Sequence, residues 1–358
     1  MDNILKERLF GVGNHDGNHG EDVKELYFYQ DNIPTHYYME YLYKYPQNEF
    51  PYNDLLDKNR SRGMLDTEYE ILDTGVFDND EYFDVKITYA KQNPTDIYIK
   101  IDITNRAATR AAITVLPTLW FYNRWAYAGA TTKPEIKYLN KNAVHASHYK
   151  LGDYYLYFEN PDLSLFTENE TNTEKVNQTP NTSVFVKDAF HDAIIEGKNL
   201  KALRNKKSGT KFSPVYKLKI SGGATKTIYC RFSNQLINKP FAKGFEQIFD
   251  ARKREADEFY STILPAEMDD DMAGIQRQAL AGLLWSKQYY HYDVDRWLNT
   301  SDGITPVNAE KQHGRNHDWK HLKNQDIISM PDKWEYPWYA AWDLAFHCIS
   351  MAVADPCF

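Results

Sequence analysis

The chain has 358 residues, a formal net charge of −8, 42% hydrophobic residues and 15% aromatic residues, which is enough apolar material for two domains and a substantial core. This composition excludes intrinsic disorder as the default state, and the acidic balance argues against nucleic acid as the main partner. No apolar run reaches the length that a membrane-spanning helix needs, so we expect no membrane partner.

A block near the N-terminus, GNHDGNHGEDVKELYFYQD, is dense in His, Asn, Asp and Glu. His15 and His19, followed by Glu21 and Asp22, could ligate a cation. The glycines among them instead favour a hydrogen-bonded loop that reaches a binding pocket from outside. We therefore expect no metal and no cofactor.

Residues 68–234 alternate apolar with polar positions and are rich in β-branched and aromatic residues, which is typical of half-buried strands. No helical segment separates them at the spacing of a βαβ unit, so the pattern favours an antiparallel β-sandwich. Residues 168–183 are polar and turn-rich and predict an exposed loop. The alternation is clearest in residues 82–90, 96–107, 111–123, 154–160, 183–190, 214–223 and 225–233.

Towards the C-terminal end the apolar period changes to that of a helix. Residues 244–264 predict a connecting helix, and residues 268–293 continue at helical spacing. Residues 336–354 predict another helix, with Pro337 in its first turn, that ends at Asp355-Pro356.

The three cysteines are an odd number without Cys-x-x-Cys spacing, which argues against both a disulfide framework and a zinc knuckle. The first residues of the chain lack the apolar core of a signal peptide. We therefore expect a cytoplasmic protein.

The segment DKWEYPWYAAWDLAFH contains Asp343 among six aromatic side chains, and no Lys or Arg follows it. On a helix, Asp343 would share a face with Tyr339, Phe346 and His347. Aromatic neighbours remove solvent from a carboxyl group and favour its protonated form, which a general acid needs at neutral pH. The alternative is a structural aspartate that caps a helix or pairs with a distant arginine.

A second aromatic cluster, LLWSKQYYHYDVDRW, places Trp285, Gln288, Tyr289 and Tyr292 at helical spacing. Core packing accounts for about half of such positions. Lys287 and Gln288 fit a core less well and could bond hydroxyl groups at the rim of a pocket.

No Gly-x-Ser-x-Gly elbow, Walker loop or dinucleotide fingerprint occurs, so carboxylate chemistry in an aromatic pocket is the remaining catalytic hypothesis. Several segments resemble glycoside hydrolase family 63 and its bacterial and fungal relatives, which are distantly related to the processing α-glucosidase I. These segments are ILKERLFGVGNHDGNHGEDVKELYFYQD, PTHYYMEYLYKYPQ, LDTGVFD, VLPTLWFYNRW and SMPDKWEYPWYAAWDLAFH.

The resemblance implies a β-sandwich domain in residues 1–238, a linker helix in residues 239–265 and the start of an (α/α)6 barrel in residues 266–358. It implies that Asp343 is the general acid of an inverting hydrolase. The residues that would bind the sugar are Trp334, Glu335, Tyr336, Trp338 and Trp342, together with Trp285, Gln288 and Lys287.

The expected function is inverting hydrolysis of an α-glucosidic or related α-glycosidic bond in an oligosaccharide or small glucoside. In the family the general base lies in the later part of the barrel, so the chain is expected to be a fragment that lacks it. The alternative is a non-catalytic carbohydrate-binding or scaffold protein with a degenerate barrel.

Overall fold

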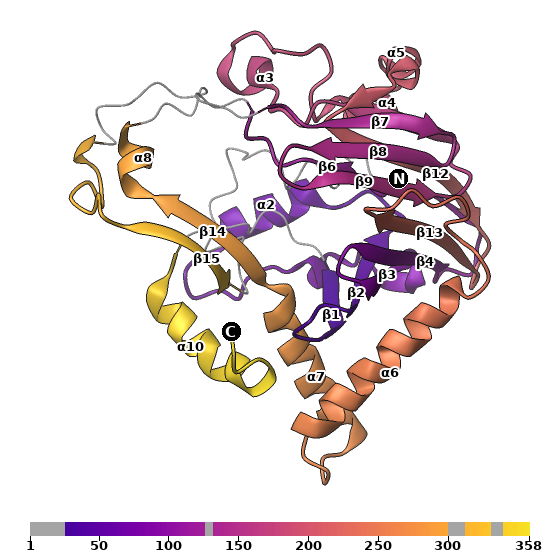
Figure 1. The fold of residues 1–358 in the computed structure, drawn as a ribbon. Coiled ribbons are helices and arrows are strands. Elements are labelled where there is room, and N and C mark those ends of the chain that lie inside the picture. Colours follow the sequence, from indigo (N-terminus) through magenta and orange to yellow (C-terminus); the bar gives the residue numbers. More distant parts are fainter. Residues whose placement is uncertain (1–25, 126–131, 300–311, 331–338) are drawn as a thin grey trace.

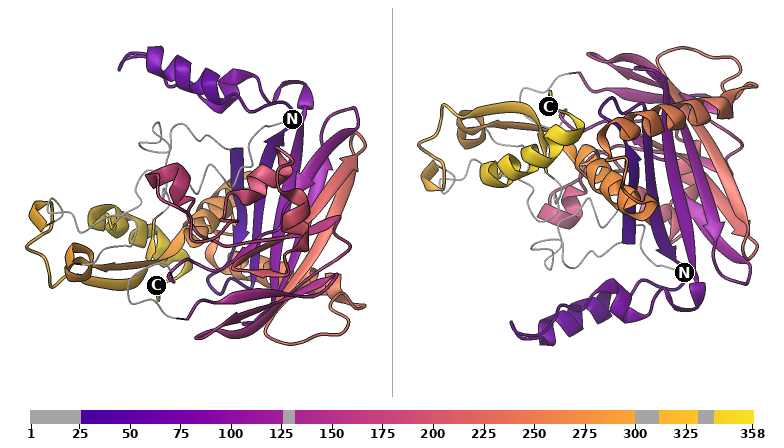
Figure 2. Two further views of the ribbon diagram at one scale, coloured as in Figure 1. Left: turned by 90° about the horizontal axis from the view of Figure 1, so that it is seen from above. Right: turned by 90° about the horizontal axis from the view of Figure 1, so that it is seen from below.

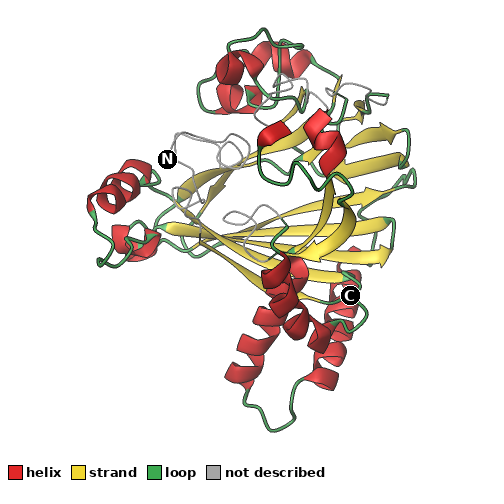
Figure 3. Cartoon of the chain, turned by 90° about the vertical axis from the view of Figure 1, so that its left-hand side faces the viewer, coloured by secondary structure: helices red, strands yellow, loops and turns green. Residues whose placement is uncertain are grey.

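The computed structural model describes residues 26–125, 132–299, 312–330 and 339–358 (Figure 1). Within them, antiparallel strands form a nine-stranded sheet, a four-stranded sheet and a separate two-stranded sheet, and helices lie along the edges and one face of the strands (Figure 3). No helix of the described segments is long and apolar enough to cross a membrane.

The larger sheet has nine described strands, all paired in antiparallel fashion. Its first two strands lie before residue 68, where the expected strand region began. In spatial order the strands are β1 (Leu26–Asn32), β2 (Tyr38–Pro46), β3 (Tyr82–Asn93), β4 (Asp96–Asn105), β13 (Thr225–Ser233), β9 (Gly152–Phe158), β8 (Ala143–His148), β7 (Glu135–Asn140) and β11 (Ser208–Gly209).

The smaller sheet packs face to face with the larger one and shares a core with it. Phe212 of the smaller sheet lies with its ring centroid 5.3 Å from that of Phe158 in the larger sheet, and both side chains are fully buried. A core shared by two antiparallel sheets is what the alternating pattern predicted. The strands of this sheet are β10 (Leu163–Thr167), β12 (Lys211–Ile220), β5 (Ala111–Val115) and β6 (Leu119–Trp120).

Residues 183–190 do not form the expected strand. The segment turns and enters a short helix because Ala189, Phe190 and Ala193 are spaced to pack together into a small core beneath β10. The expected loop at residues 168–183 is irregular apart from one short helix. The short helices are α2 (Tyr52–Ser61), η1 (Ile71–Thr74), η2 (Asp78–Asp80), α3 (Thr173–Asn177), α4 (Ala189–Ile194), α5 (Leu200–Asn205) and α8 (Val294–Asn299).

The connecting helix predicted at residues 244–264 is confirmed as α6 (Phe245–Ile263). It lies across β2, β3 and β4 on the face of the large sheet that is turned away from the shared core (Figure 2). Phe245 packs on Tyr98 with ring centroids 4.6 Å apart, and Phe249 extends the contact. This apolar contact fixes the helix to the sheet.

The helix predicted through residue 293 is shorter than expected, because α7 (Asp270–Trp285) ends at Trp285. The chain continues as β14 (Lys287–Asp293), which pairs with β15 (Lys323–Ser329). The tyrosines at positions 289, 290 and 292 suit a strand that can pair with a partner. Lys287 and Gln288 therefore lie on a strand, and the prediction that they lie on a barrel helix is wrong.

The last predicted helix is confirmed as α10 (Ala341–Ala354), and its end at Asp355 is as expected. Pro337, expected in its first turn, lies outside the described residues. Helices α7 and α10 contact each other, and α10 also contacts β15. These two helices do not by themselves form the expected (α/α)6 barrel.

Candidate functional site

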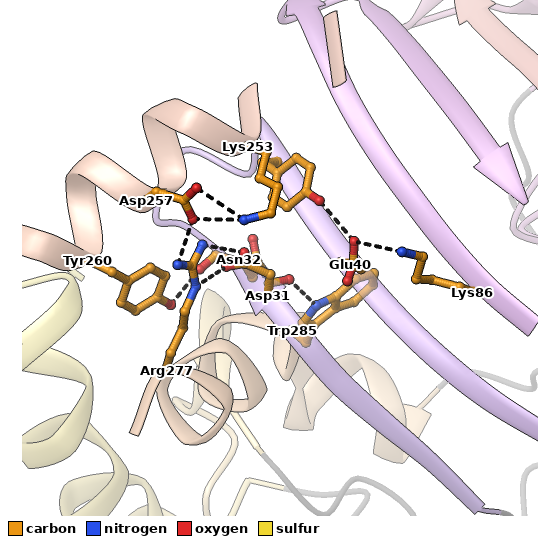
Figure 4. A network of polar contacts seen from close by, with 10 residues as sticks. Asp31, Asn32, Glu40, Lys86, Lys253, Asp257, Tyr260, Arg277 and Trp285 are labelled. Atoms are coloured by element: carbon orange, nitrogen blue, oxygen red, sulfur yellow. Dashed lines mark hydrogen bonds and ion pairs between the residues drawn. The ribbon is translucent and has the colours of Figure 1, made fainter. Parts of the chain in front are cut away.

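A cluster of polar and aromatic contacts connects α7 to the edge of the large sheet (Figure 4). We call this cluster the joint, and its residues are Tyr29, Asp31, Asp257, Tyr260, Arg277 and Trp285. Trp285 stacks on Tyr29 with ring centroids 5.3 Å apart, and its Nε1 donates a hydrogen bond of 2.9 Å to the carbonyl oxygen of Asp31. Burial raises the pKa of the Tyr29 hydroxyl to about 12. Trp285, expected to line a sugar pocket, thus faces the sheet.

Arg277 of α7 is the centre of this joint (Figure 4). Its Nε lies 3.1 Å from Oδ1 of Asp31 on β1, and its Nη1 lies 2.8 Å from Oδ1 of Asp257 on α6. The guanidinium also stacks over the ring of Tyr260, whose hydroxyl donates to the carbonyl oxygen of Asn32 at 2.7 Å. One cation therefore ties two helices to the sheet.

Asp31 is almost fully buried beside Arg277. Burial raises the pKa of its carboxyl group even though the hydrogen bond and the charge of Arg277 act in the opposite direction. The carboxylate therefore depends on Arg277 to remain ionised, and the joint is a structural element rather than an exposed catalytic pair.

Lys287 is held at the end of α10. Its Nζ lies 2.7 Å from Oδ2 of Asp355 and 4.6 Å from the ring centroid of Phe358. Asp343 is at the other end of α10, and twelve residues of helix span about 18 Å. The structure does not bring Lys287 to Asp343, so the two cannot contact the same hydroxyl group.

His36, in the turn between β1 and β2, is a titratable group close to Lys287. Its Nδ1 lies 2.9 Å from Oδ1 of Asn32. Burial, and then the positive charges of Lys287 and Lys91, lower the pKa of His36 to about 4. The imidazole is therefore neutral in the folded protein at pH values where the unfolded chain is already protonated.

This shift predicts a loss of stability in acid. The contribution is fully present above pH 6.5, the usual pKa of the unfolded histidine, and is lost as the pH falls towards the folded value near 4. For a partly exposed group we expect about 2 kcal/mol less free energy of unfolding at pH 4.5 than at pH 7.5 from His36 alone.

The measurement is urea unfolding of the wild type and the His36→Gln variant at both pH values. The variant should lose less stability in acid than the wild type, whereas His321→Gln, at an exposed histidine, should behave as the wild type does. Equal acid losses in wild type and His36→Gln would contradict the assignment.

Asp343 lies on a helix, as the sequence predicted, but it stands in the first turn of α10 because this helix begins at Ala341 and not at the expected residue 336. Its side chain is half-buried, and its carboxylate makes no ion pair within the described ranges. Its position on the helix is close to that of His347, whose Nδ1 lies 3.4 Å from the carbonyl oxygen of Ser329 on β15. The half-buried side of α10 therefore faces the two-stranded sheet of β14 and β15.

The aromatic residues around Asp343 divide between two sides of the helix. Tyr339, just before α10, has its ring centroid 5.9 Å from that of Tyr290 on β14. Trp342 is 72% exposed and contacts Phe346 edge to face at 5.2 Å. Phe346, expected on the same face as Asp343, therefore joins Trp342 on the exposed side.

Helix α10 also presents an apolar stripe to solvent. Trp342, Phe346, Ile349 and Val353 follow one another at helical spacing, and all four are strongly exposed. Met272 and Ile275 on α7 are exposed as well. Soluble proteins rarely leave a continuous apolar patch of this kind uncovered unless it is an interaction surface.

The remaining predicted residues are divided between a strand and the parts of the chain that are not described. Gln288 is half-buried on β14 opposite Ile328. No group of three His, Cys, Asp or Glu side chains that could hold a metal occurs among the described residues. The other candidates lie outside the described residues. The candidate sugar-binding residues among them are Trp334, Glu335, Tyr336 and Trp338, and the candidate cation ligands are His15, His19, Glu21 and Asp22.

Sequence reasoning missed the structural joint that Asp31 and Arg277 form. The two residues are 246 positions apart, and no local pattern connects them. The only signal was indirect: an arginine on the apolar helix at residues 268–293, which needs an acidic partner if that helix packs against a sheet.

No family model matches the chain. The uncharacterized protein YMR196W of Saccharomyces cerevisiae is 41% identical over 402 residues, which cover 99% of this chain and 37% of the yeast protein. The chain thus spans about 37% of the length of this curated relative.

Two solved structures have a distant likeness to the chain. A protein described as a kojibiose phosphorylase from human microbiome has 9% identity and a TM-score of 0.25, over 59% of this chain and 23% of that chain. A polysaccharide lyase has 10% identity and a TM-score of 0.25, over 46% and 22%. Both act on carbohydrates by name, but a likeness this weak supports no argument about fold or function.

Proposed function

We propose that the chain is part of a glycoside hydrolase, similar to family 63, that cleaves an α-glucosidic or related α-glycosidic bond with inversion. Asp343 would protonate the glycosidic oxygen. The observation that carries the proposal is the position of this carboxylate: half-buried, in the first turn of α10, and without an ion pair in the described part of the chain. In this proposal the carboxyl group has the role of the general acid.

An inverting hydrolase needs a second carboxylate about 6.5–9.5 Å from the acid, so that a water molecule fits between the base and the sugar. We assign no residue of this chain to that role. Glu335 and Asp326 are the acids near Asp343 in sequence, but the resemblance gives neither of them the role of base. The base is proposed to come from a helical region beyond residue 358.

We further propose the division into a sandwich domain, a linker helix and the first part of an (α/α)6 barrel that begins near residue 266. The support is the exposed apolar stripe of α10, together with the exposed Met272 and Ile275 of α7. Further barrel helices packed on these side chains would bury them. The cytoplasm remains the proposed compartment, in keeping with three free cysteines.

The test is to express the protein that the complete open reading frame encodes and to assay it with a panel of α-linked and β-linked glucosides. Release of glucose from α-linked members alone supports the proposal. Cleavage of β-linked substrates alone, or of none, would contradict it.

The second candidate is a carbohydrate-binding or scaffold protein. It is favoured by one observation: α6 and α7 brace the large sheet through Tyr260, Leu280 and the Arg277 joint. Titration of tryptophan fluorescence with glucosides separates the candidates. Saturable quenching without glucose release indicates a binding protein, and no response at all indicates a scaffold.

A further inference from the structure

A cavity of about 210 Å³ opens beside β7 and α5. These two elements lie on the opposite side of the molecule from α10 (Figure 1). Three segments form it: the turn between β7 and β8, the start of β10 and the chain between α5 and β11. Its apolar lining includes Tyr138, Leu163 and Phe166, and Ser164 adds a hydroxyl group.

Four cationic side chains line this cavity, namely Lys141, Arg204, Lys206 and Lys207. None of the described residues that line it is acidic. Because the whole chain carries a net charge of −8, this concentration of positive charge goes against the overall balance. Cations that line one cavity repel one another, and a bound anion relieves that repulsion.

Two acids that are close in sequence to the lining residues are engaged with other groups. Oδ2 of Asp162 accepts a hydrogen bond of 2.6 Å from the backbone nitrogen of Lys217. Oε2 of Glu168 lies 3.0 Å from Nζ of Lys133, while its Oε1 lies 3.8 Å from Nζ of Lys206. Glu168 thus neutralises only part of the charge.

The cations differ in how they are held. Nζ of Lys207 lies 4.5 Å from the ring centroid of Tyr138, and Lys206 is positioned by Glu168. The guanidinium of Arg204 is exposed at the last turn of α5 and forms no ion pair within the described residues. A free guanidinium beside two positioned ammonium groups is an arrangement that suits the oxygens of a phosphate group.

We propose that this cavity binds a small phosphorylated molecule and recognises it through its phosphate group. Arg204 and Lys207 contact the phosphate oxygens, and the surface formed by Tyr138 and Leu163 receives the rest of the ligand. The volume fits a phosphate with a small substituent rather than a dinucleotide. This site is independent of the function proposed for Asp343.

Isothermal titration at constant ionic strength, with inorganic phosphate, a hexose phosphate and the unphosphorylated hexose as probes, tests the proposal. We expect saturable binding of the two phosphate compounds and none of the hexose at this site. The Arg204→Ala variant should bind the hexose phosphate about tenfold more weakly, the equivalent of one lost hydrogen bond to a charged group.

Lys201→Ala is the matched control, because Lys201 is an exposed cation on α5 that does not line the cavity. It should leave the affinity unchanged, as should Asp343→Asn. Absence of saturable binding of both phosphate compounds would overturn the proposal. Equal weakening by Lys201→Ala and Arg204→Ala would also overturn it, since it would indicate a general effect of net charge.

Discussion

Replacing Arg277 by methionine should lower the free energy of unfolding by about 3–5 kcal/mol, because the change leaves a buried carboxylate without its cation. The side chain of Asp31 is 8% exposed, and burial already raises its pKa in the presence of Arg277. In the variant Asp31 must either ionise unpaired or take up a proton. The loss should therefore shrink as the pH is lowered from 7 to 4.5.

Urea unfolding at the two pH values measures this effect. Arg254→Met is the matched control, because Arg254 is an exposed arginine on α6, and it should change stability by less than about 0.5 kcal/mol. The double variant Asp31→Asn with Arg277→Met should recover much of the loss. A loss in Arg277→Met no larger than that of Arg254→Met would show that the joint contributes little.

Replacing Asp343 by asparagine should reduce the turnover of an α-glucoside with a poor leaving group by about a thousandfold, because the amide cannot donate the proton of a general acid. A dinitrophenyl glucoside, whose leaving group needs no proton, should be affected far less. The fold should remain intact, since Asp343 makes no ion pair within the described ranges.

Asp326→Asn is the control for Asp343→Asn, because Asp326 is an exposed acid on the neighbouring strand β15. It should retain nearly full turnover of both substrates. Equal sensitivity of the two leaving groups to Asp343→Asn would assign Asp343 a role other than proton donation, and near-normal activity would remove it from the mechanism.

The periodic parts of the fold could be predicted from sequence. Alternation identified most of the strands that contribute to the shared core, and helical spacing identified α6 and α10 within a few residues. Both patterns report which side of an element is buried, and that depends mainly on local residue order. The placement of Asp343 on a helix followed from the same reasoning, whereas its position in the first turn did not, because α10 begins five residues later than expected.

The parts that depend on distant partners could not be predicted. Trp285, Gln288 and Tyr292 fit helical spacing, but Tyr290 and Tyr292 also fit the spacing of a strand. These residues form a strand because their backbone pairs with β15, and the local sequence does not show that β15 will lie beside them. In the same way nothing local reveals that Lys287 pairs with Asp355, because that contact forms only when α10 folds back towards the start of β14.

The most direct test of the central claim is proton NMR of the first glucose released from an α-glucoside by the complete protein. An inverting enzyme that uses Asp343 as its acid must release β-glucose first, with α-glucose appearing only through slow mutarotation. The Asp343→Asn variant should release neither anomer at a comparable rate. Initial release of α-glucose, or hydrolysis that survives the substitution, would contradict the account.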